Sequence, residues 1–134
     1  MDCIFCKIAS GEFNSWKVCE DEHALAFLDI NPVAEYHTIV VPKKHYANIF
    51  DIPADELARV MATVKRVVDL YGDKLGLKNC QIIHNAGAEA QQEVFHFHIH
   101  IIPRAHGDGN NITWKTHLEL RDKFAEMMGR IRPQ

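Results

Sequence analysis

The segment His96-Phe97-His98-Ile99-His100-Ile101-Ile102 alternates imidazole and apolar side chains without a break. In a β-strand, successive side chains point to opposite faces, so residues two apart share a face. The pattern predicts a strand with its three histidines on one face, whereas a helix would scatter the imidazoles around its axis. The apolar residues of the opposite face, which we expect to face the core, are Phe95, Phe97, Ile99 and Ile101.

Three histidines at strict alternation indicate chemistry more than packing, although a single strand histidine is usually satisfied by its neighbours. A metal bound by all three is disfavoured by geometry. At a rise of roughly 3.3 Å per residue, His96 and His100 start about 13 Å apart. With Zn–N bonds of about 2.0–2.1 Å, this outer pair just fails to meet, although two of the three could share a metal. A row of imidazoles suits a reaction in which one ring is the nucleophile and the others are ligands or proton donors.

This segment resembles the His-x-His-x-His signature, with x apolar, of the histidine triad (HIT) nucleotide hydrolases and transferases. Further blocks that resemble this family follow in the expected order: Phe27–Pro32, His37–His45, and Asn85–Gly87 with Gln92–Val94. The resemblance covers most of the chain, from about residue 3 to residue 104. It implies one HIT domain over residues 1–134, with an antiparallel sheet of about five strands and two main helices. It also implies a homodimer.

Composition and element order agree with this α+β fold. A chain of 134 residues with 47% hydrophobic content can bury a core. A net charge of −3 does not favour a nucleic-acid partner, and no apolar run is long enough for a bilayer. The beginning of the sequence has no secretory pattern, and four cysteines fit a reducing compartment. We therefore expect a cytoplasmic protein without a nucleic-acid or membrane partner.

Local patterns predict the elements around the triad. They are a short helical turn over 3–11, two strands within 16–30, a strand over 36–42, a helix over 51–73 ended by Gly72 and Gly76, and a strand over 80–84 that pairs antiparallel with the triad strand. The apolar face of the long helix consists of Leu57, Val60, Met61, Val64, Val67, Val68 and Tyr71. A capping box over 116–119 predicts a final helix whose apolar face is Leu120, Phe124, Met127 and Ile131.

A nucleotide site is implied by the resemblance. Asp29 is expected to accept two ribose hydroxyls, although a carboxylate at this place can also be an ordinary turn residue. The apolar slot for a purine base would be formed by Ile4, Phe5, Ile8, Phe27 and Ile30, each of which could equally belong to the core. The phosphate would meet His98, His100, Asn85, Gln92 and the amides of a loop rich in small residues. Gln91 stands where relatives usually have glycine, and a non-glycine residue resists positive φ.

The expected chemistry is nucleophilic attack by His98 on the α-phosphorus of a purine nucleoside phosphoramidate or related nucleotide, with release of AMP. A nucleotidyl-imidazole intermediate would then be hydrolysed by water. An imidazole with an ordinary pKa near 6.5 is largely neutral at pH 7, as a nucleophile must be. His100 and His37 would stabilise phosphoryl charge or assist the leaving group.

The Cys3-x-x-Cys6 pair has three interpretations: buried inert thiols, a redox motif, or half of a zinc site. Against the redox interpretation, no strand precedes the pair. In relatives that carry this pair, zinc is also held by the histidine that ends the Pro-Lys-Lys-His block and by the first triad histidine. Those positions are His45 and His96 here, so the resemblance implies a closed, structural Cys₂His₂ zinc site.

Other functions are compatible with the same residues. A dinucleoside polyphosphate hydrolase of the same fold is the first, and Pro103-Arg104 after the triad resembles that branch. A regulatory protein that binds nucleotide without turnover is the second. A metallohydrolase that uses two triad histidines is the third, and it would lose activity on metal removal without unfolding.

Overall fold

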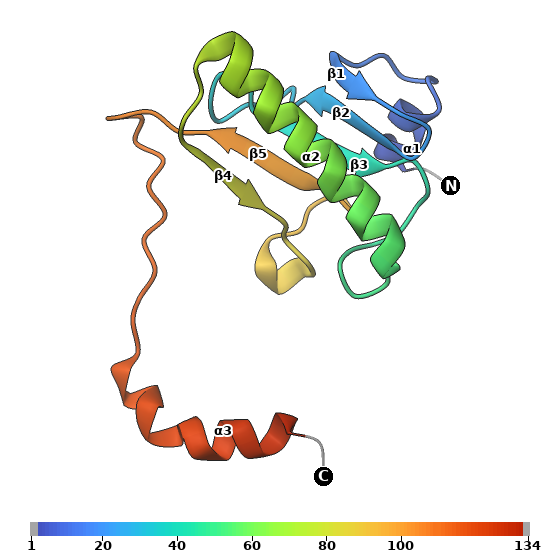
Figure 1. The fold of residues 1–134 in the computed structure, drawn as a ribbon. Helices are drawn as coiled ribbons and strands as arrows, with labels where there is room; N and C mark the ends of the chain where they lie inside the picture. Colours follow the sequence, from blue (N-terminus) through green and yellow to red (C-terminus); the bar gives the residue numbers. More distant parts are fainter. Residues whose placement is uncertain (1–2, 133–134) are drawn as a thin grey trace.

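A five-stranded antiparallel sheet carries the long helix α2 on one face and the short helix α1 on the other (Figure 1). The computed structural model describes residues 3–132. Its elements in chain order are α1 (Ile4–Ala9), β1 (Lys17–Glu20), β2 (Ala24–Leu28), β3 (Thr38–Pro42), α2 (Ala54–Leu75), β4 (Cys80–Ile83), the 3₁₀ helix η1 (Ala88–Ala90), β5 (Ile99–Pro103), the 3₁₀ helix η2 (Leu118–Lys123) and α3 (Phe124–Ile131). The strand order is β1-β2-β3-β5-β4, which confirms the predicted α+β class.

The register of the sheet places the last triad histidine on an inner strand. His100 on β5 lies opposite Ile39 of β3 and opposite Ile83 of β4, and both pairings are antiparallel. The predicted pairing of the 80–84 segment with the triad strand is confirmed. Because β5 lies between two strands, its backbone is held on both edges.

The triad strand is shorter than its alternating sequence predicts. β5 begins at Ile99, so His96 and His98 precede the regular strand. The N–H of Phe97 donates to the carbonyl of Tyr46, 2.6 Å away in the segment between β3 and α2, instead of joining the ladder. Phe97 is fully buried as predicted, but Phe95 is 47% exposed, so its assignment to the core was wrong.

Two apolar clusters cover the two faces of the sheet. The cluster under α2 contains Ala26, Val40, Ile52, Val60, Val64, Val67, Tyr71, Phe97, Ile99 and Ile101. The cluster under α1 contains Phe5, Ile8, Leu25, Phe27, Ile39 and Val41. Neighbouring residues such as Val40 and Val41 belong to different clusters, as alternation along a strand requires. The triad histidines thus share the face that α1 covers.

The long helix begins and ends later than predicted. It starts after Pro53, because the Asp51 carboxylate instead accepts the N–H groups of Ala47 and Asn48 in the preceding turn. It continues through Gly72 to Leu75 and ends at Gly76, whose φ of 70° gives the left-handed C-cap. Most of its predicted apolar face packs on the sheet, but Met61 is 41% exposed.

The C-terminal part leaves the sheet after β5. In Figure 1 the chain runs in an extended course from β5 to α3, which lies away from the sheet. The predicted capping box is wrong: η2 begins after His117 without a side-chain cap, and only then does α3 start. The apolar residues of α3 are exposed, with Phe124 at 53% and Ile131 at 72%. No described helix is both long and apolar enough to cross a membrane.

Candidate functional site

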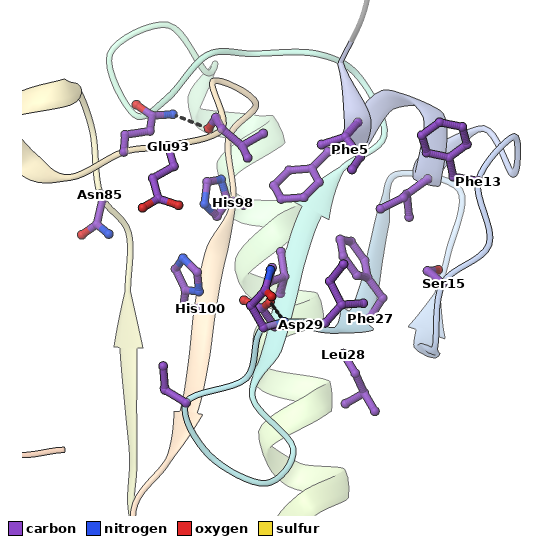
Figure 2. Close-up of a pocket in the computed structure, with 18 of the residues that line it drawn as sticks. Phe5, Phe13, Ser15, Phe27, Leu28, Asp29, Asn85, Glu93, His98 and His100 are labelled. Atoms are coloured by element: carbon purple, nitrogen blue, oxygen red, sulfur yellow. Dashed lines mark hydrogen bonds between the residues drawn. The ribbon is translucent and has the colours of Figure 1, made fainter. Parts of the chain in front are cut away.

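A cavity of about 1250 Å³ opens on the sheet face that carries α1 (Figure 2). It lies between α1, the end of β2, the start of β5 and the loop after β4. The structure brings together around it all ten residues that the sequence assigns to nucleotide binding: Ile4, Phe5, Ile8, Phe27, Asp29, Ile30, Asn85, Gln92, His98 and His100. A cavity of this size can hold a nucleotide.

One end of the cavity is apolar and aromatic. The Phe5 and Phe27 rings meet edge to face with centroids 5.7 Å apart, and Phe5 meets His98 in the same way at 5.1 Å. Phe5 and Phe27 are buried, whereas Ile4 is 43% and Ile30 is 78% exposed. The first two therefore form the floor of an apolar slot, and the two isoleucines form its exposed rim.

Asp29 lies where β2 ends, beside this slot. Its N–H donates to the carbonyl of His37 over 2.9 Å, and one carboxylate oxygen accepts the N–H of Asn31 over 2.8 Å. The other oxygen, Oδ2, lies 3.5 Å from Nε2 of His37. The carboxylate is thus fixed on the wall of the cavity, with acceptor capacity left for hydroxyl groups.

The hydrogen bonds of His98 determine which of its nitrogens is free. Its Nδ1 lies 2.7 Å from the carbonyl oxygen of His96, which can only accept, so Nδ1 carries the proton. Nε2 of the neutral ring therefore keeps a bare lone pair. Because the His98 ring lines the cavity while its side chain is only 6% exposed, this lone pair is available to a bound ligand and otherwise shielded.

Hydrogen bonds favour the opposite tautomer of the His100 ring, with the proton on Nε2. The N–H of Val33 donates to Nδ1 of His37 over 3.1 Å, so the proton of a neutral His37 is on Nε2. That Nε2–H points to Nδ1 of His100, 2.9 Å away, which therefore accepts. His100 then carries its proton on Nε2, and it lines the cavity next to His98 at a centroid distance of 5.0 Å. His37 does not line the cavity but orients His100 from behind.

Burial keeps these imidazoles neutral. It lowers the pKa of His98 and of His37 below the ordinary value, and it lowers the pKa of His100 to about 4, with nearby imidazoles adding to the effect. Removing an ion from water costs free energy, so the uncharged ring is favoured at neutral pH. Asp29, His37 and His100 place three possible metal ligands within 4.8 Å of one another, but the direct bond between the two imidazoles occupies the facing nitrogens.

The loop after β4 is held by the Gln92 amide. Its Oε1 accepts the N–H of Gly87 and a proton of the Asn48 side chain, and its Nε2 donates to the carbonyls of Ala47 and Val94. Every hydrogen-bonding position of this amide is therefore used. Gln92 lines the cavity, and its bonds assign it to positioning the loop more than to contacting a phosphate.

Gln91 adopts the conformation that glycine usually supplies. Its φ of 71° and ψ of 25° lie in the left-handed region, and its N–H donates to the carbonyl of Ala88 over 2.9 Å. Gln91 thus adopts positive φ although it is not glycine. This backbone conformation costs about 1 kcal/mol of strain in a residue with a Cβ atom.

His84 is a residue that the sequence reasoning missed. Its ring stacks on Phe97 at 4.4 Å, its Nε2 accepts the N–H of Ile49, and its Nδ1 therefore donates to the carbonyl of His98, 3.0 Å away. It ties the backbone of His98 to the segment before α2. The available signal was a histidine directly before Asn85, at the end of a strand that pairs with the triad strand.

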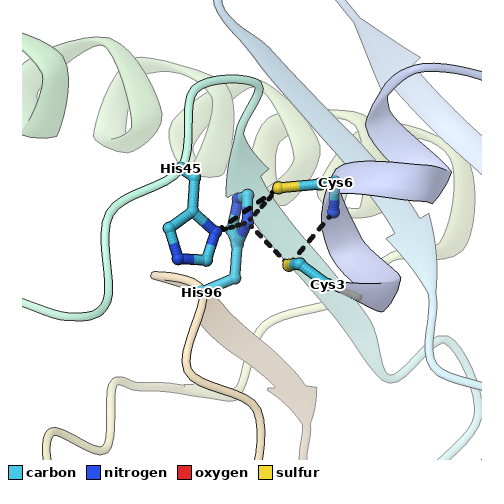
Figure 3. Close-up of side chains that lie close together, drawn as sticks. All are labelled: Cys3, Cys6, His45 and His96. Carbon is cyan, nitrogen blue, oxygen red and sulfur yellow. Dashed lines mark hydrogen bonds between the residues drawn. The ribbon is translucent and has the colours of Figure 1, made fainter. Parts of the chain in front are cut away.

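A cluster of two cysteines and two histidines, which are possible metal ligands, forms around His96. Sγ of Cys3, Sγ of Cys6, Nδ1 of His45 and Nδ1 of His96 all lie within 4.8 Å of one another (Figure 3). The two Nδ1 atoms are 3.2 Å apart, and the sulfurs are 3.3 and 3.4 Å from Nδ1 of His96. Around a tetrahedral Zn²⁺, neighbouring nitrogen and sulfur donors lie about 3.3–3.8 Å apart. The four predicted ligands therefore fit one metal ion.

Hydrogen bonds around the cluster orient His96 and Cys3 as possible metal ligands. Nε2 of His96 donates to the carbonyl of Pro42 over 2.8 Å, so Nδ1 presents its lone pair to the thiols. The N–H of Cys6 points to Sγ of Cys3, the N-cap of α1. Burial raises the pKa of the Cys6 thiol to about 11 and lowers the pKa of His96 to about 4. A bound cation would favour the thiolate and leave the imidazole neutral.

Comparisons with known proteins agree with this geometry. Residues 10–107 match the HIT domain. A HIT-like protein of Methanocaldococcus jannaschii is 53% identical over 129 residues, which are 95% of this chain and 99% of that one. The adenosine 5′-monophosphoramidase of Saccharomyces cerevisiae is 37% identical over 126 residues, 93% of this chain and 77% of that one. The crystal structure of a HIT family protein from Bacillus subtilis superimposes with a TM-score of 0.85 at 37% identity, covering 100% of both chains. The chain therefore belongs to the HIT family.

Proposed function

We propose that this protein is a nucleotide hydrolase that cleaves purine nucleoside 5′-phosphoramidates at the α-phosphate and releases the nucleoside monophosphate. The observation that carries the proposal is the pair of opposite tautomers: His98 offers a bare Nε2 to the cavity, and His100 beside it offers an Nε2–H. A nucleophile next to a hydrogen-bond donor is the minimum that displacement at phosphorus requires. A relative named adenosine 5′-monophosphoramidase supports the same substrate class.

In the first step, Nε2 of His98 forms a bond to the α-phosphorus and the P–N bond of the substrate breaks. The electron pair of that bond goes to the amine nitrogen, which takes up a proton from solvent and leaves as the amine. His100 donates a hydrogen bond from Nε2 to a phosphoryl oxygen, and the Nδ1–H of His98 stays bonded to the carbonyl of His96 as the ring gains positive charge.

In the second step, water attacks the phosphorus of the nucleotidyl-His98 intermediate. The P–Nε2 bond breaks, its electron pair returns to the imidazole, and the water proton passes to solvent as the monophosphate forms. His98 itself is 6% exposed, so water would reach the phosphorus through the cavity once the amine has left. The nucleoside would be held with its base in the slot of Phe5 and Phe27 and its ribose hydroxyls on Asp29.

The residues that would hold a structural Zn²⁺ are Cys3, Cys6, His45 and His96. A Zn²⁺ bound there would supply folding free energy by joining α1 and the segment after β3 to the triad segment. The proposal predicts that a chelator releases one equivalent of zinc and lowers the melting temperature. Cys3→Ser should do the same, whereas Cys80→Ser, which changes a cysteine outside the cluster, should keep the metal.

A homodimer is the proposed assembly, as the family resemblance implies. The apolar side chains exposed on η2 and α3 support association, because a helix of 8 residues is marginal in water without a packing partner. Sedimentation equilibrium of the full chain should give twice the chain mass of 15.3 kDa. A truncation before residue 118 should weaken the association.

The enzymatic proposal is tested with adenosine 5′-phosphoramidate, wild type and His98→Ala, with the fold of the variant checked by circular dichroism. Wild type should release AMP, and the folded variant should lose activity by about 10³-fold or more. Binding of AMP without turnover by the wild type would refute phosphoramidase activity. Substantial activity in the variant would refute His98 as the nucleophile.

A further inference from the structure

The cavity divides into two ends with different chemistry on either side of His98. In Figure 2, Phe5, Phe13 and Phe27 lie on one side of His98, and Asn85 and Glu93 lie on the other. If the aromatic end holds the base, a phosphorus in reach of His98 must carry its leaving group toward the end formed by the loop after β4. The residues of this loop therefore meet the part of the substrate that departs.

Glu93 is the acidic residue at this second end. Its side chain points into the cavity between Asn85 and His98 (Figure 2). It makes no ion pair with any residue in the described range 3–132. Its backbone is fixed, because the neighbouring Gln92 is bonded on all sides and 5% exposed. The exposed Glu93 carboxylate therefore lines the loop end of the cavity, and no described residue compensates its charge by an ion pair.

The rest of the cavity does not offset this charge. Among the described residues that line it, Glu12, Asp29 and Glu93 are acidic and none is Lys or Arg. Lys7 lies over the Phe13 ring at 5.1 Å from its centroid, toward the aromatic end. Glu12 follows α1 and Asp29 follows β2, the two elements that carry Phe5 and Phe27 of the aromatic end. An anionic leaving group would thus meet a carboxylate and no described cation at the loop end.

We propose that Glu93 is a specificity-determining residue that makes the enzyme prefer phosphoramidates whose departing amine carries a second, positively charged group, such as a diamine or a basic amino acid side chain. The inference rests on the proposed function. The bonds that form and break are those given above, and the distant ammonium is not altered by the reaction. A cation within about 8 Å of a carboxylate in a partly solvated site gains a preference of roughly tenfold over a neutral group.

The test uses three adenosine 5′-phosphoramidates of equal chain length, made from butylamine, 1,4-diaminobutane and 4-aminobutyrate. Wild type should show the highest kcat/KM for the cationic amide, about tenfold above the neutral amide, and the lowest for the anionic amide. Glu93→Gln should reduce the ratio of cationic to neutral kcat/KM to near one and raise the rate for the anionic amide. Each variant's own neutral substrate is the reference, so a general loss of activity does not affect the ratio.

Glu12→Gln is the matched control, because it removes a carboxylate from the same cavity at the aromatic end. It should keep the wild-type ratio. If Glu93→Gln also keeps it, or if wild type shows no preference for the cationic amide, the proposed role of Glu93 is wrong. Turnover of the neutral amide through His98 would leave the hydrolase proposal standing in that case.

A binding experiment separates the two proposals if no amide is turned over. Dissociation constants of the same three amides are measured with His98→Ala and with the double variant His98→Ala/Glu93→Gln. Tighter binding of the cationic amide, lost in the double variant, would support Glu93 while turnover fails. Equal binding of all three amides, or no binding of any, would overturn the role of Glu93.

Discussion

His96 and His98 are two residues apart and both are nearly fully buried, yet their backbone partners free opposite ring nitrogens. His96 donates from Nε2 to the carbonyl of Pro42 and turns Nδ1 toward two thiols. His98 donates from Nδ1 to the carbonyl of His96 and leaves Nε2 for the cavity. The residue type, the burial and the strand-like spacing are shared. The position of the carbonyl acceptor differs, and this difference separates the proposed metal ligand His96 from the proposed nucleophile His98.

This difference shows how one short segment can serve two sites. The two clusters share the backbone between His96 and His98, so a metal bound at one would fix the position of the ring at the other. Neither imidazole can exchange roles without a new backbone acceptor.

The largest effects are expected from His96→Ala and His98→Ala, which should fail in different ways. His98→Ala should lose activity by at least about 10³-fold while it retains zinc and most of its stability. His96→Ala should lose the metal and several kcal/mol of unfolding free energy. The measurements are AMP release, zinc content and denaturant unfolding of each variant. Loss of zinc in His98→Ala would show that the two sites are not separable.

The pH dependence of kcat/KM should reveal the buried nucleophile. Burial lowers the pKa of His98, and only the neutral ring attacks, so the acid limb of the profile should lie below pH 6.5. Between pH 7.5 and pH 6.0 an ordinary imidazole would lose roughly three-quarters of its neutral form. The enzyme should lose much less over that range, after subtraction of uncatalysed hydrolysis. A midpoint at or above 6.5 would contradict the environment described for His98.

His84→Leu should separate positioning from binding. The substitution removes the bonds to the N–H of Ile49 and the carbonyl of His98. We expect kcat to fall about tenfold and KM to change by less than about twofold, with a loss of about 1–2 kcal/mol of stability. His106→Leu, at an exposed position, is the matched control. A rise in KM with unchanged kcat would mean that His84 shapes the binding pocket and does not align His98.

The sequence predicts different parts of the fold and of the candidate site. The loop that connects the 80–84 strand to the triad strand was sufficient to predict the pairing of β4 with β5, and the periodicity of α2 was sufficient to predict its apolar face on the sheet. The late start of the strand at Ile99 was not predictable, because it depends on a hydrogen bond between Phe97 and Tyr46, which are distant in the sequence. The capping box before α3 failed for a related reason. The segment around α3 lies away from the sheet in Figure 1, so packing on the sheet does not favour its predicted start.

At the site, the residues were predictable and the roles of the ring nitrogens were not. All ten expected cavity residues and all four expected metal ligands come together. Tautomers depend on carbonyl positions such as that of Pro42, and no sequence pattern encodes them. His84 and Glu93 were missed because a lone histidine or glutamate in a loop carries no signal until its neighbours in space are known.

The smallest expected effect concerns the loop between the two strands that flank the cavity. Gln91→Gly removes the strain of φ 71°, which favours the folded state, but glycine also gains freedom in the unfolded chain, which opposes this gain. The net increase in the free energy of unfolding should be about 0.5–1 kcal/mol. Urea unfolding of the two proteins measures it, with the substitution Gln81→Gly in β4 as a destabilising reference. A loss of stability at position 91 would mean that the Gln91 side chain makes a compensating contact.

The most direct measurement is the long-range ¹H–¹⁵N NMR spectrum of the histidine rings, assigned with single His→Gln variants. Near neutral pH, we expect His98 to be neutral with its proton on Nδ1, and His96 to carry its proton on Nε2 with Nδ1 free or metal-bound. A protonated Nε2 on His98 would leave the cavity without its nucleophile, and the proposed mechanism would then be wrong.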